Sequence, residues 1–260
     1  MSDGGVLEAT GLSAGHGGPP VVVGVNLRIR PGERWAILGP NGVGKSTLLK
    51  TLAGLLPAAA GEVRLHDRAL RDWPRRELAR HLAWVPQQLH PPEGFLALEW
   101  LLLGRAAHLG MWGLAGAADE ARAKALLQDL GLAHLAGRPL HTLSGGEQRL
   151  LSLARGLFQG GELLLLDEPT ASLDLRHQLE LLARLKEAGE GGLASVCVLH
   201  DLNQAQDFAT HALLLGGGRV VAAGPAPEVL EASRLGTLYG VTLERALTST
   251  GRVLFVPAQR

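Results

Sequence analysis

The chain has 260 residues, 46% of them hydrophobic, which is enough for one large domain or two small ones. Basic and acidic residues number 25 each, so the net charge is zero and the basic excess typical of nucleic-acid-binding proteins is absent. The N-terminus lacks a signal-peptide pattern, and no apolar run approaches the roughly 18 residues needed to span a bilayer. We therefore expect a cytoplasmic protein that has no nucleic-acid partner and reaches a membrane only through other subunits.

Strands and helices follow one another along the chain. From residue 159 onward buried strands alternate with helices, which predicts parallel pairing and an α/β fold, whereas 89–158 carries the apolar spacing of helices. In chain order we predict strands within 6–12, 21–29 and 31–39, a helix in 44–56, strands in 61–67 and 81–87, helices in 96–104, 119–132 and 144–158, a strand in 163–169, a helix in 175–188 and a strand in 193–200.

The pattern predicts one domain, 1–260, built from several parts. They are a β-subdomain within about 1–30, a core formed by 31–88 and 159–216, a helical subdomain at 89–158 and a tail at 217–260 that mixes strand and short helix.

The segment "GPNGVGKST" fits the phosphate-loop pattern G-x-x-x-x-G-K-[ST] and lies between a predicted strand and a predicted helix. Its glycines let backbone N–H groups turn toward a phosphate, and the helix start adds partial positive charge. Lys45 would reach the β- and γ-phosphates, and the Ser46 hydroxyl would ligate Mg²⁺. The candidate ATP-binding residues are Gly39, Pro40, Asn41, Gly42, Val43, Gly44, Lys45, Ser46 and Thr47.

Polar side chains end three predicted strands, at the sheet edge where ligands bind in parallel sheets. Asp167 and Glu168 follow four leucines; we expect Asp167 to hold Mg²⁺ and Glu168 to activate the attacking water. Two acids alone would more often be solvated groups at a strand end; the four leucines and the upstream phosphate loop favour the functional interpretation. His200 ends the next strand and can donate to the γ-phosphate, and Gln87 can touch Mg²⁺ or the water.

The ten histidines show no H-x-x-x-H spacing, and the single cysteine, Cys197, lies in an apolar run. We therefore predict no zinc site and no internal disulfide. A second anion-binding helix start is predicted in "TLSGGEQRLL", residues 142–151.

Six motifs in order resemble the ATP-binding cassette (ABC) ATPases: "GPNGVGKST", "VPQ", "LSGGE", "LLLLDEP", "SLD" and a histidine after a strand. The resemblance covers about 7–257. It implies a P-loop NTPase fold with a RecA-like core, an N-terminal antiparallel β-subdomain and an inserted α-helical subdomain.

The resemblance also implies roles that spacing alone does not give. In such ATPases the signature residues, here Ser144, Gly145, Gly146 and Glu147, serve the ATP held by the other subunit of a head-to-tail homodimer. By the same similarity, Ser172, Leu173 and Asp174 form the loop that crosses the dimer interface. Gln87 resembles the sensor glutamine beside the groove for a transmembrane partner.

Two departures from the family pattern stand out. Arg149 and Leu150 occupy places where many relatives have glutamine and arginine, which leaves the role of that helix in signalling open. His16 occupies the place of an aromatic residue that stacks on adenine. An imidazole can stack with less surface, or His16 is simply a loop residue.

Softer matches at 85–110, 200–224 and 238–257 resemble importer ATPases for iron-siderophores, haem and cobalamin. We therefore expect an ATP- and Mg²⁺-dependent subunit on the cytoplasmic face of the inner membrane, bound to permease subunits and served indirectly by a solute-binding protein. The alternatives are an exporter ATPase, a soluble ABC protein acting on chromosomes or ribosomes, and a non-hydrolysing module. The absence of heptads and of basic excess disfavours the second, and the intact Lys45, Asp167, Glu168 and His200 disfavour the third.

Overall fold

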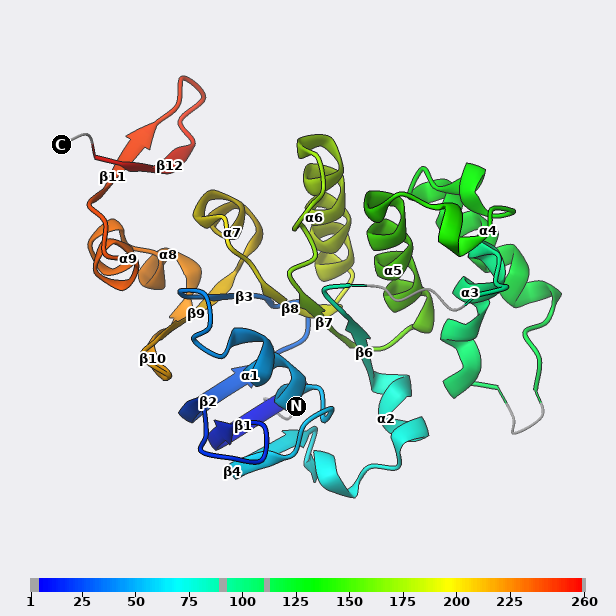
Figure 1. The fold of residues 1–260 in the computed structure, drawn as a ribbon, viewed down its shortest axis with the longest axis horizontal. Coiled ribbons are helices and arrows are strands. Elements are labelled where there is room, and N and C mark those ends of the chain that lie inside the picture. Colours follow the sequence, from blue (N-terminus) through cyan, green and yellow to red (C-terminus); the bar gives the residue numbers. More distant parts are fainter. Residues whose placement is uncertain (1–4, 89–92, 110–112, 259–260) are drawn as a thin grey trace.

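The computed structural model describes residues 5–88, 93–109 and 113–258; residues 89–92 and 110–112 of the predicted helical region lie outside these ranges. Within them, ten strands form one sheet in the order β5-β4-β1-β2-β10-β9-β3-β8-β7-β6 (Figure 1). The strands are β1 (Leu7–Ala14), β2 (Val22–Ile29), β3 (Arg34–Leu38), β4 (Ala58–Leu65), β5 (Arg68–Ala69), β6 (Leu82–Val85), β7 (Leu163–Asp167), β8 (Ala194–Val198), β9 (His211–Gly216) and β10 (Arg219–Pro225).

Helices cover this sheet on both faces. They are α1 (Lys45–Leu52), α2 (Arg75–His81), α3 (Ala97–Leu102), α4 (Ala117–Asp129), α5 (Gly145–Gln159), α6 (Leu175–Glu190), α7 (Leu202–Phe208), α8 (Ala226–Val229) and α9 (Ala232–Tyr239). A separate hairpin of β11 (Leu243–Leu247) and β12 (Val253–Pro257) extends beyond α9, at the red end of the chain in Figure 1.

The five strands from β9 to β6 in the sheet order are parallel, as the alternation of strands and helices predicts. β3 pairs in parallel with β8 and β9, and β7 with β6 and β8. The register places Val85 opposite Leu166 and Asp167 opposite Val198. The residues that follow β6, β7 and β8 therefore leave the sheet at one edge.

An antiparallel part joins this core. β1 pairs with β2 and β4, and β4 with β5, all antiparallel, while β2 reaches β10 through a parallel pair between Val23 and Arg219. β4 thus pairs with the N-terminal strand β1, and β5 with β4, although the predicted core range 31–88 includes both. The reason is that pairing partners follow from tertiary packing, which the local pattern of 61–67 does not contain.

Two hydrophobic cores lie on the two faces of the sheet. One includes residues of α5, α6 and α7, above the parallel strands in Figure 1; the other includes α1 and the antiparallel strands below. Along β7, Leu164 and Leu166 belong to the first core and Leu163 and Leu165 to the second, because side chains alternate along a strand. Every residue of β7 is buried, which explains its unbroken apolar run.

Candidate functional site

The glycine-rich loop between β3 and α1 depends on its glycines for conformation and for space. Gly39, Gly42 and Gly44 have φ values of 152°, 76° and 103°. A Cβ on Gly39 would lie 2.3 Å from the Leu215 carbonyl oxygen, and one on Gly44 would lie 2.4 Å from a Val22 methyl group. Side chains at these positions are therefore excluded, and the loop keeps its backbone open toward the cleft.

Lys45, the first residue of α1, is only 5% exposed, and its ammonium group points back into the loop. Nζ donates to the carbonyl oxygens of Gly39 at 2.7 Å and Pro40 at 3.0 Å. Burial lowers the pKa of Lys45, and the charges of Glu168 and Asp167 oppose that shift. The lysine is thus held by loop carbonyls and, among the residues that the structure describes, makes no side-chain ion pair, an arrangement suited to an anionic ligand.

A serine and an aspartate meet beside the lysine. The Ser46 hydroxyl donates to Asp167 Oδ1 at 2.7 Å, and Asp167 is 2% exposed. Burial raises the pKa of the Asp167 carboxyl, while the hydrogen bond from Ser46 acts in the opposite direction. Two oxygen donors at this separation form a hard donor set of the type that Mg²⁺ prefers.

Glu168 lies between the other two predicted catalytic side chains. Gln87 Nε2 donates to Glu168 Oε2 at 2.6 Å, and His200 Nε2 lies 2.6 Å from Glu168 Oε1. Glu168 itself has φ of 50°, which is unusual for a residue with a side chain. Strand ends far apart in the sequence therefore deliver these three groups to one point.

These groups surround a cleft of about 850 Å³. Gly39, Pro40, Val43 and Asp167 are not part of its lining. The lining residues are His16, Val21, Asn41, Gly42, Gly44, Lys45, Ser46, Thr47, Gln87, Glu168 and His200.

His16 is an exposed residue of this lining. Its Nε2 lies 3.0 Å from the Thr47 hydroxyl. The structure therefore brings His16 to the glycine-rich loop although the two are 31 residues apart, and stacking on adenine remains a prediction.

The signature residues lie elsewhere. Ser144 caps the start of α5: its Oγ accepts from the Glu147 N–H at 3.2 Å, while Glu147 Oε2 accepts from the Ser144 N–H at 2.7 Å. The hydrogen bond from the Ser144 backbone holds the pKa of Glu147 below its ordinary value. Glu147 also accepts from Arg138 at 3.0 Å, so its carboxylate is engaged at the helix start. Gly145 has open space around it.

The predicted interface loop packs directly behind the signature. Ser172 has φ of 61°, Leu173 is buried, and a Cβ on Gly146 would lie 3.5 Å from a Leu173 methyl group. Asp174 caps α6 by accepting from the His177 N–H at 2.9 Å. The loop and the signature thus form one surface, and its four signature residues are not part of the cleft lining.

Two contacts with the site were not predicted from the sequence. The Tyr239 hydroxyl, at the end of α9, accepts a hydrogen bond of 3.0 Å from the Gly39 N–H, across 200 residues. Arg149 donates to the Gln87 carbonyl, so the first family departure links α5 to the end of β6. Burial lowers the pKa of Arg149, and the charge of Glu168 opposes this. The unusual Arg149 was a sequence signal for its contact with Gln87. The contact between Tyr239 and Gly39 had no such signal.

The glycine-rich loop before α1, the carboxylates of Asp167 and Glu168 and the parallel sheet define a P-loop ATPase. The ABC transporter family matches residues 22–171. The hemin import ATP-binding protein HmuV of Streptomyces coelicolor is 44% identical over 97% of this chain and 90% of its own length. The iron(3+)-hydroxamate import ATP-binding protein FhuC of Bacillus subtilis is 36% identical, covering 92% and 89%. The chain belongs to the ABC transporter family, as its ATP-hydrolysing, transport-coupled component.

Solved structures of ABC transporter proteins are similar to this chain. An ABC transporter assigned to the metal-chelate type, in an inward-facing conformation, matches with a TM-score of 0.84 and 28% identity, over 98% of both chains. An ATP-binding cassette solved as a dimer, in a post-hydrolysis state with ADP and Pi bound, matches with a TM-score of 0.76 and 28% identity, over 84% of this chain and 98% of that one. The predicted fold class is confirmed. Within the described residues, every helix is too short or too polar to cross a membrane.

Proposed function

We propose that this chain is the ATPase subunit of an importer for an iron chelate, either haem or a hydroxamate siderophore. Its similarity to HmuV and FhuC over nine tenths of the chain supports this solute class. Cobalamin is also compatible with the sequence motifs, but HmuV and FhuC are named as importers of hemin and iron(3+)-hydroxamate. The peripheral position under permease subunits belongs to the same proposal.

One observation carries the hydrolytic part of the proposal, namely the position of Glu168 between Gln87 and His200 at the cleft. Glu168 would accept a proton from the attacking water at Oε2 or Oε1, and Gln87 would orient that water. His200 would donate to the γ-phosphate. These groups act mainly through position and charge, as expected for phosphoryl transfer.

Lys45 and the loop N–H groups would bind the phosphates. Ser46 and Asp167 would hold Mg²⁺, with Gln87 nearby, because their oxygens already meet at 2.7 Å. When bound, the ion supplies positive charge next to the phosphate oxygens.

The signature residues would complete the cleft of a second copy. Their helix start is exposed at Gly145 and does not line the cleft of its own chain, which supports a head-to-tail homodimer. Each site would then consist of the Lys45 loop from one chain and the Ser144–Gly146 turn from its partner.

Mixed dimers test this composite site. Lys45→Ala alone and Ser144→Arg alone should each abolish ATP hydrolysis. Mixing the two variants should restore part of the activity, since one of the two sites then has an intact loop and an intact signature. Cross-linked mixed dimers that remain inactive would contradict sharing of the site. Uptake of haem and of ferric hydroxamates by cells that carry this chain, compared with cells that carry Lys45→Ala, tests the solute class.

A further inference from the structure

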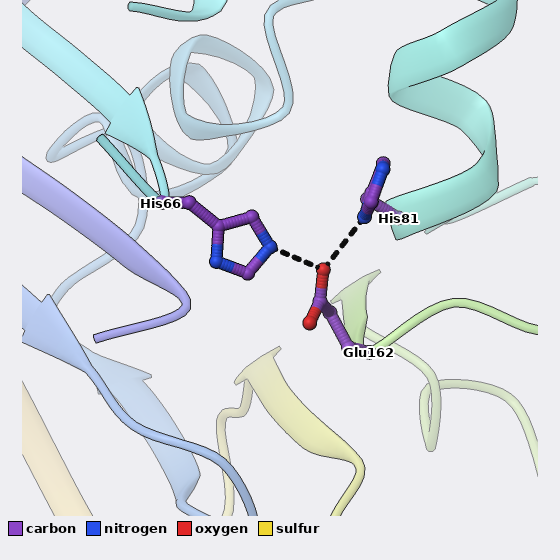
Figure 2. A group of neighbouring side chains, drawn as sticks. All are labelled: His66, His81 and Glu162. Atoms are coloured by element: carbon purple, nitrogen blue, oxygen red, sulfur yellow. Dashed lines mark hydrogen bonds and ion pairs between the residues drawn. The ribbon is translucent and has the colours of Figure 1, made fainter. Parts of the chain in front are cut away.

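Three side chains far apart in the sequence meet at the other end of the sheet (Figure 2). His66 lies in the turn after β4, His81 is the last residue of α2, and Glu162 immediately precedes β7. β6 and β7 begin here, and Gln87 and Glu168 follow their far ends, so this cluster lies at the opposite ends of two strands that lead to the cleft.

The two imidazoles converge on a single carboxylate oxygen. His66 Nε2 and His81 Nδ1 each lie 2.7 Å from Glu162 Oε1, and one ligand atom from each residue lies within 4.8 Å of the other two. The side chains are 45%, 36% and 36% exposed, so an ion from solvent reaches them without opening the core. Among the described residues, no lysine or arginine pairs with Glu162.

The backbone fixes the origins of all three side chains. The Glu162 N–H donates to the His81 carbonyl at 2.9 Å, and the His66 N–H donates to the Val6 carbonyl at 2.9 Å. The backbone before Glu162 is tightly confined, because a Cβ on Gly161 would lie 2.5 Å from the His81 carbonyl oxygen. Such rigid origins lower the cost of assembling a ligand set.

We propose that His66, His81 and Glu162 bind a divalent transition-metal ion, with Zn²⁺ as the representative case and water completing the coordination. Two imidazole nitrogens and a carboxylate oxygen suit Zn²⁺ and its neighbours rather than Mg²⁺. Tetrahedral bonds of about 2.0–2.1 Å place ligand atoms roughly 3.3 Å apart, so each 2.7 Å contact must widen by only about half an ångström. In the metal-free cluster His66 Nε2 and His81 Nδ1 each donate to the Glu162 carboxylate. The ion would replace these protons, each nitrogen would bind it through its lone pair, and each neutral ring would carry its proton on the other nitrogen.

This site departs from the prediction that the chain has no zinc site, which rested on short histidine spacings. The ligands are 15 and 81 residues apart along the chain, and only the fold brings them together. The ion would tie the turn after β4 to the starts of β6 and β7, a bridging role in the fold rather than a part of hydrolysis.

Zinc titration of the full-length, metal-stripped protein tests the proposal. Calorimetry at neutral pH should show one saturable equivalent of Zn²⁺. Millimolar Mg²⁺ is present because it competes with Zn²⁺ for the Ser46 and Asp167 oxygens. Co²⁺ should give the visible absorption of a low-coordinate site. The variants His66→Gln, His81→Gln and Glu162→Gln should each lose at least about tenfold in affinity. His141→Gln, at an exposed histidine outside the cluster, should bind as the unaltered chain does.

Thermal unfolding provides a second readout. Zn²⁺ should raise the Tm of the unaltered chain and of His141→Gln, and leave that of folded His66→Gln unchanged. His66 is the most exposed ligand, so this variant is the one best placed to keep its fold, as circular dichroism would verify. Absence of saturable binding, or Zn²⁺ affinities of His66→Gln and Glu162→Gln equal to that of the unaltered chain, would show that the cluster is only a hydrogen-bonded triad and would overturn the proposal.

Discussion

Glu168 combines a strained backbone with two short side-chain contacts. Its φ of 50° directs the carboxylate toward Gln87 and His200, and both partners come from neighbouring strand ends. Residues held in such conformations require support from their surroundings, and they cluster at functional sites. The same residue follows a fully buried strand, so its position is set by the sheet rather than by a mobile loop.

Replacing Glu168 with glutamine should separate binding from hydrolysis. The amide keeps the size of the side chain and removes the base, so we expect kcat to fall by at least about 10²-fold. ATP binding, measured by equilibrium titration, should remain within a few-fold of that of the unaltered chain. Turnover near the original rate would remove Glu168 from the role of base.

Tyr239 supports the first residue of the glycine-rich loop. Tyr239→Phe should lower the free energy of unfolding by about 1 kcal/mol, because the Gly39 N–H loses its acceptor. Urea denaturation measures this change. Thr237→Ala removes an exposed hydroxyl from the same helix and should change stability by less than about 0.5 kcal/mol. Equal effects of the two variants would argue against the specific contact.

At the scale of elements, α5 packs closely against the sheet through a glycine. A Cβ on Gly156 would lie 2.8 Å from a Val85 methyl group and 2.9 Å from a Leu164 methyl group. The absence of a side chain therefore lets the helix that carries the signature approach β6 and β7, the strands that Gln87 and Glu168 follow. Arg149 adds a polar link between the same elements.

Gly156→Ala should push α5 away from these strands. The methyl group gains helix propensity, but overpacking should outweigh that gain and cost about 1–3 kcal/mol in stability. Gly137→Ala, where a Cβ meets open space, is the matched control and should be nearly neutral. Chemical denaturation of both variants checks the difference. A stabilised Gly156→Ala protein would mean that the core accommodates the methyl group.

Elements with strong local signals could be predicted from the sequence. The leucine run of β7, the periodicity of α5 and the glycine pattern before α1 each predict their own structure. Because the carboxyl ends of parallel strands meet at one edge of a sheet, the convergence of Gln87, Glu168 and His200 could also be predicted. The short α2 and α7 went unpredicted, because seven residues carry little periodicity. Contacts such as Tyr239 with Gly39, and the cluster around Glu162, depend on tertiary packing and leave no local signal.

At the scale of the whole molecule, the single cysteine lies in an interior strand of the sheet, between β3 and β7. Cys197, in β8, is fully buried, and burial raises the pKa of its thiol. The thiolate required for alkylation is therefore scarce in the folded chain.

Cys197 should consequently report global unfolding. We expect its alkylation to be negligible in the native state and to rise with the denaturant-induced unfolding transition, since a fully buried interior strand opens only with the core. Mass spectrometry of labelled protein, compared with circular dichroism, checks this agreement. Labelling well before the spectroscopic transition would show that β8 opens locally.

The two faces of β7 belong to separate cores, while Asp167 at its end accepts the hydrogen bond from Ser46 beside the glycine-rich loop. Substitutions on one face can accumulate without disturbing the other, provided that the strand ends keep their register. Lineages can then drift in most of their interior while retaining the same chemistry. The 28% identity and TM-score of 0.84 shared with the metal-chelate type transporter are what such independent divergence would produce.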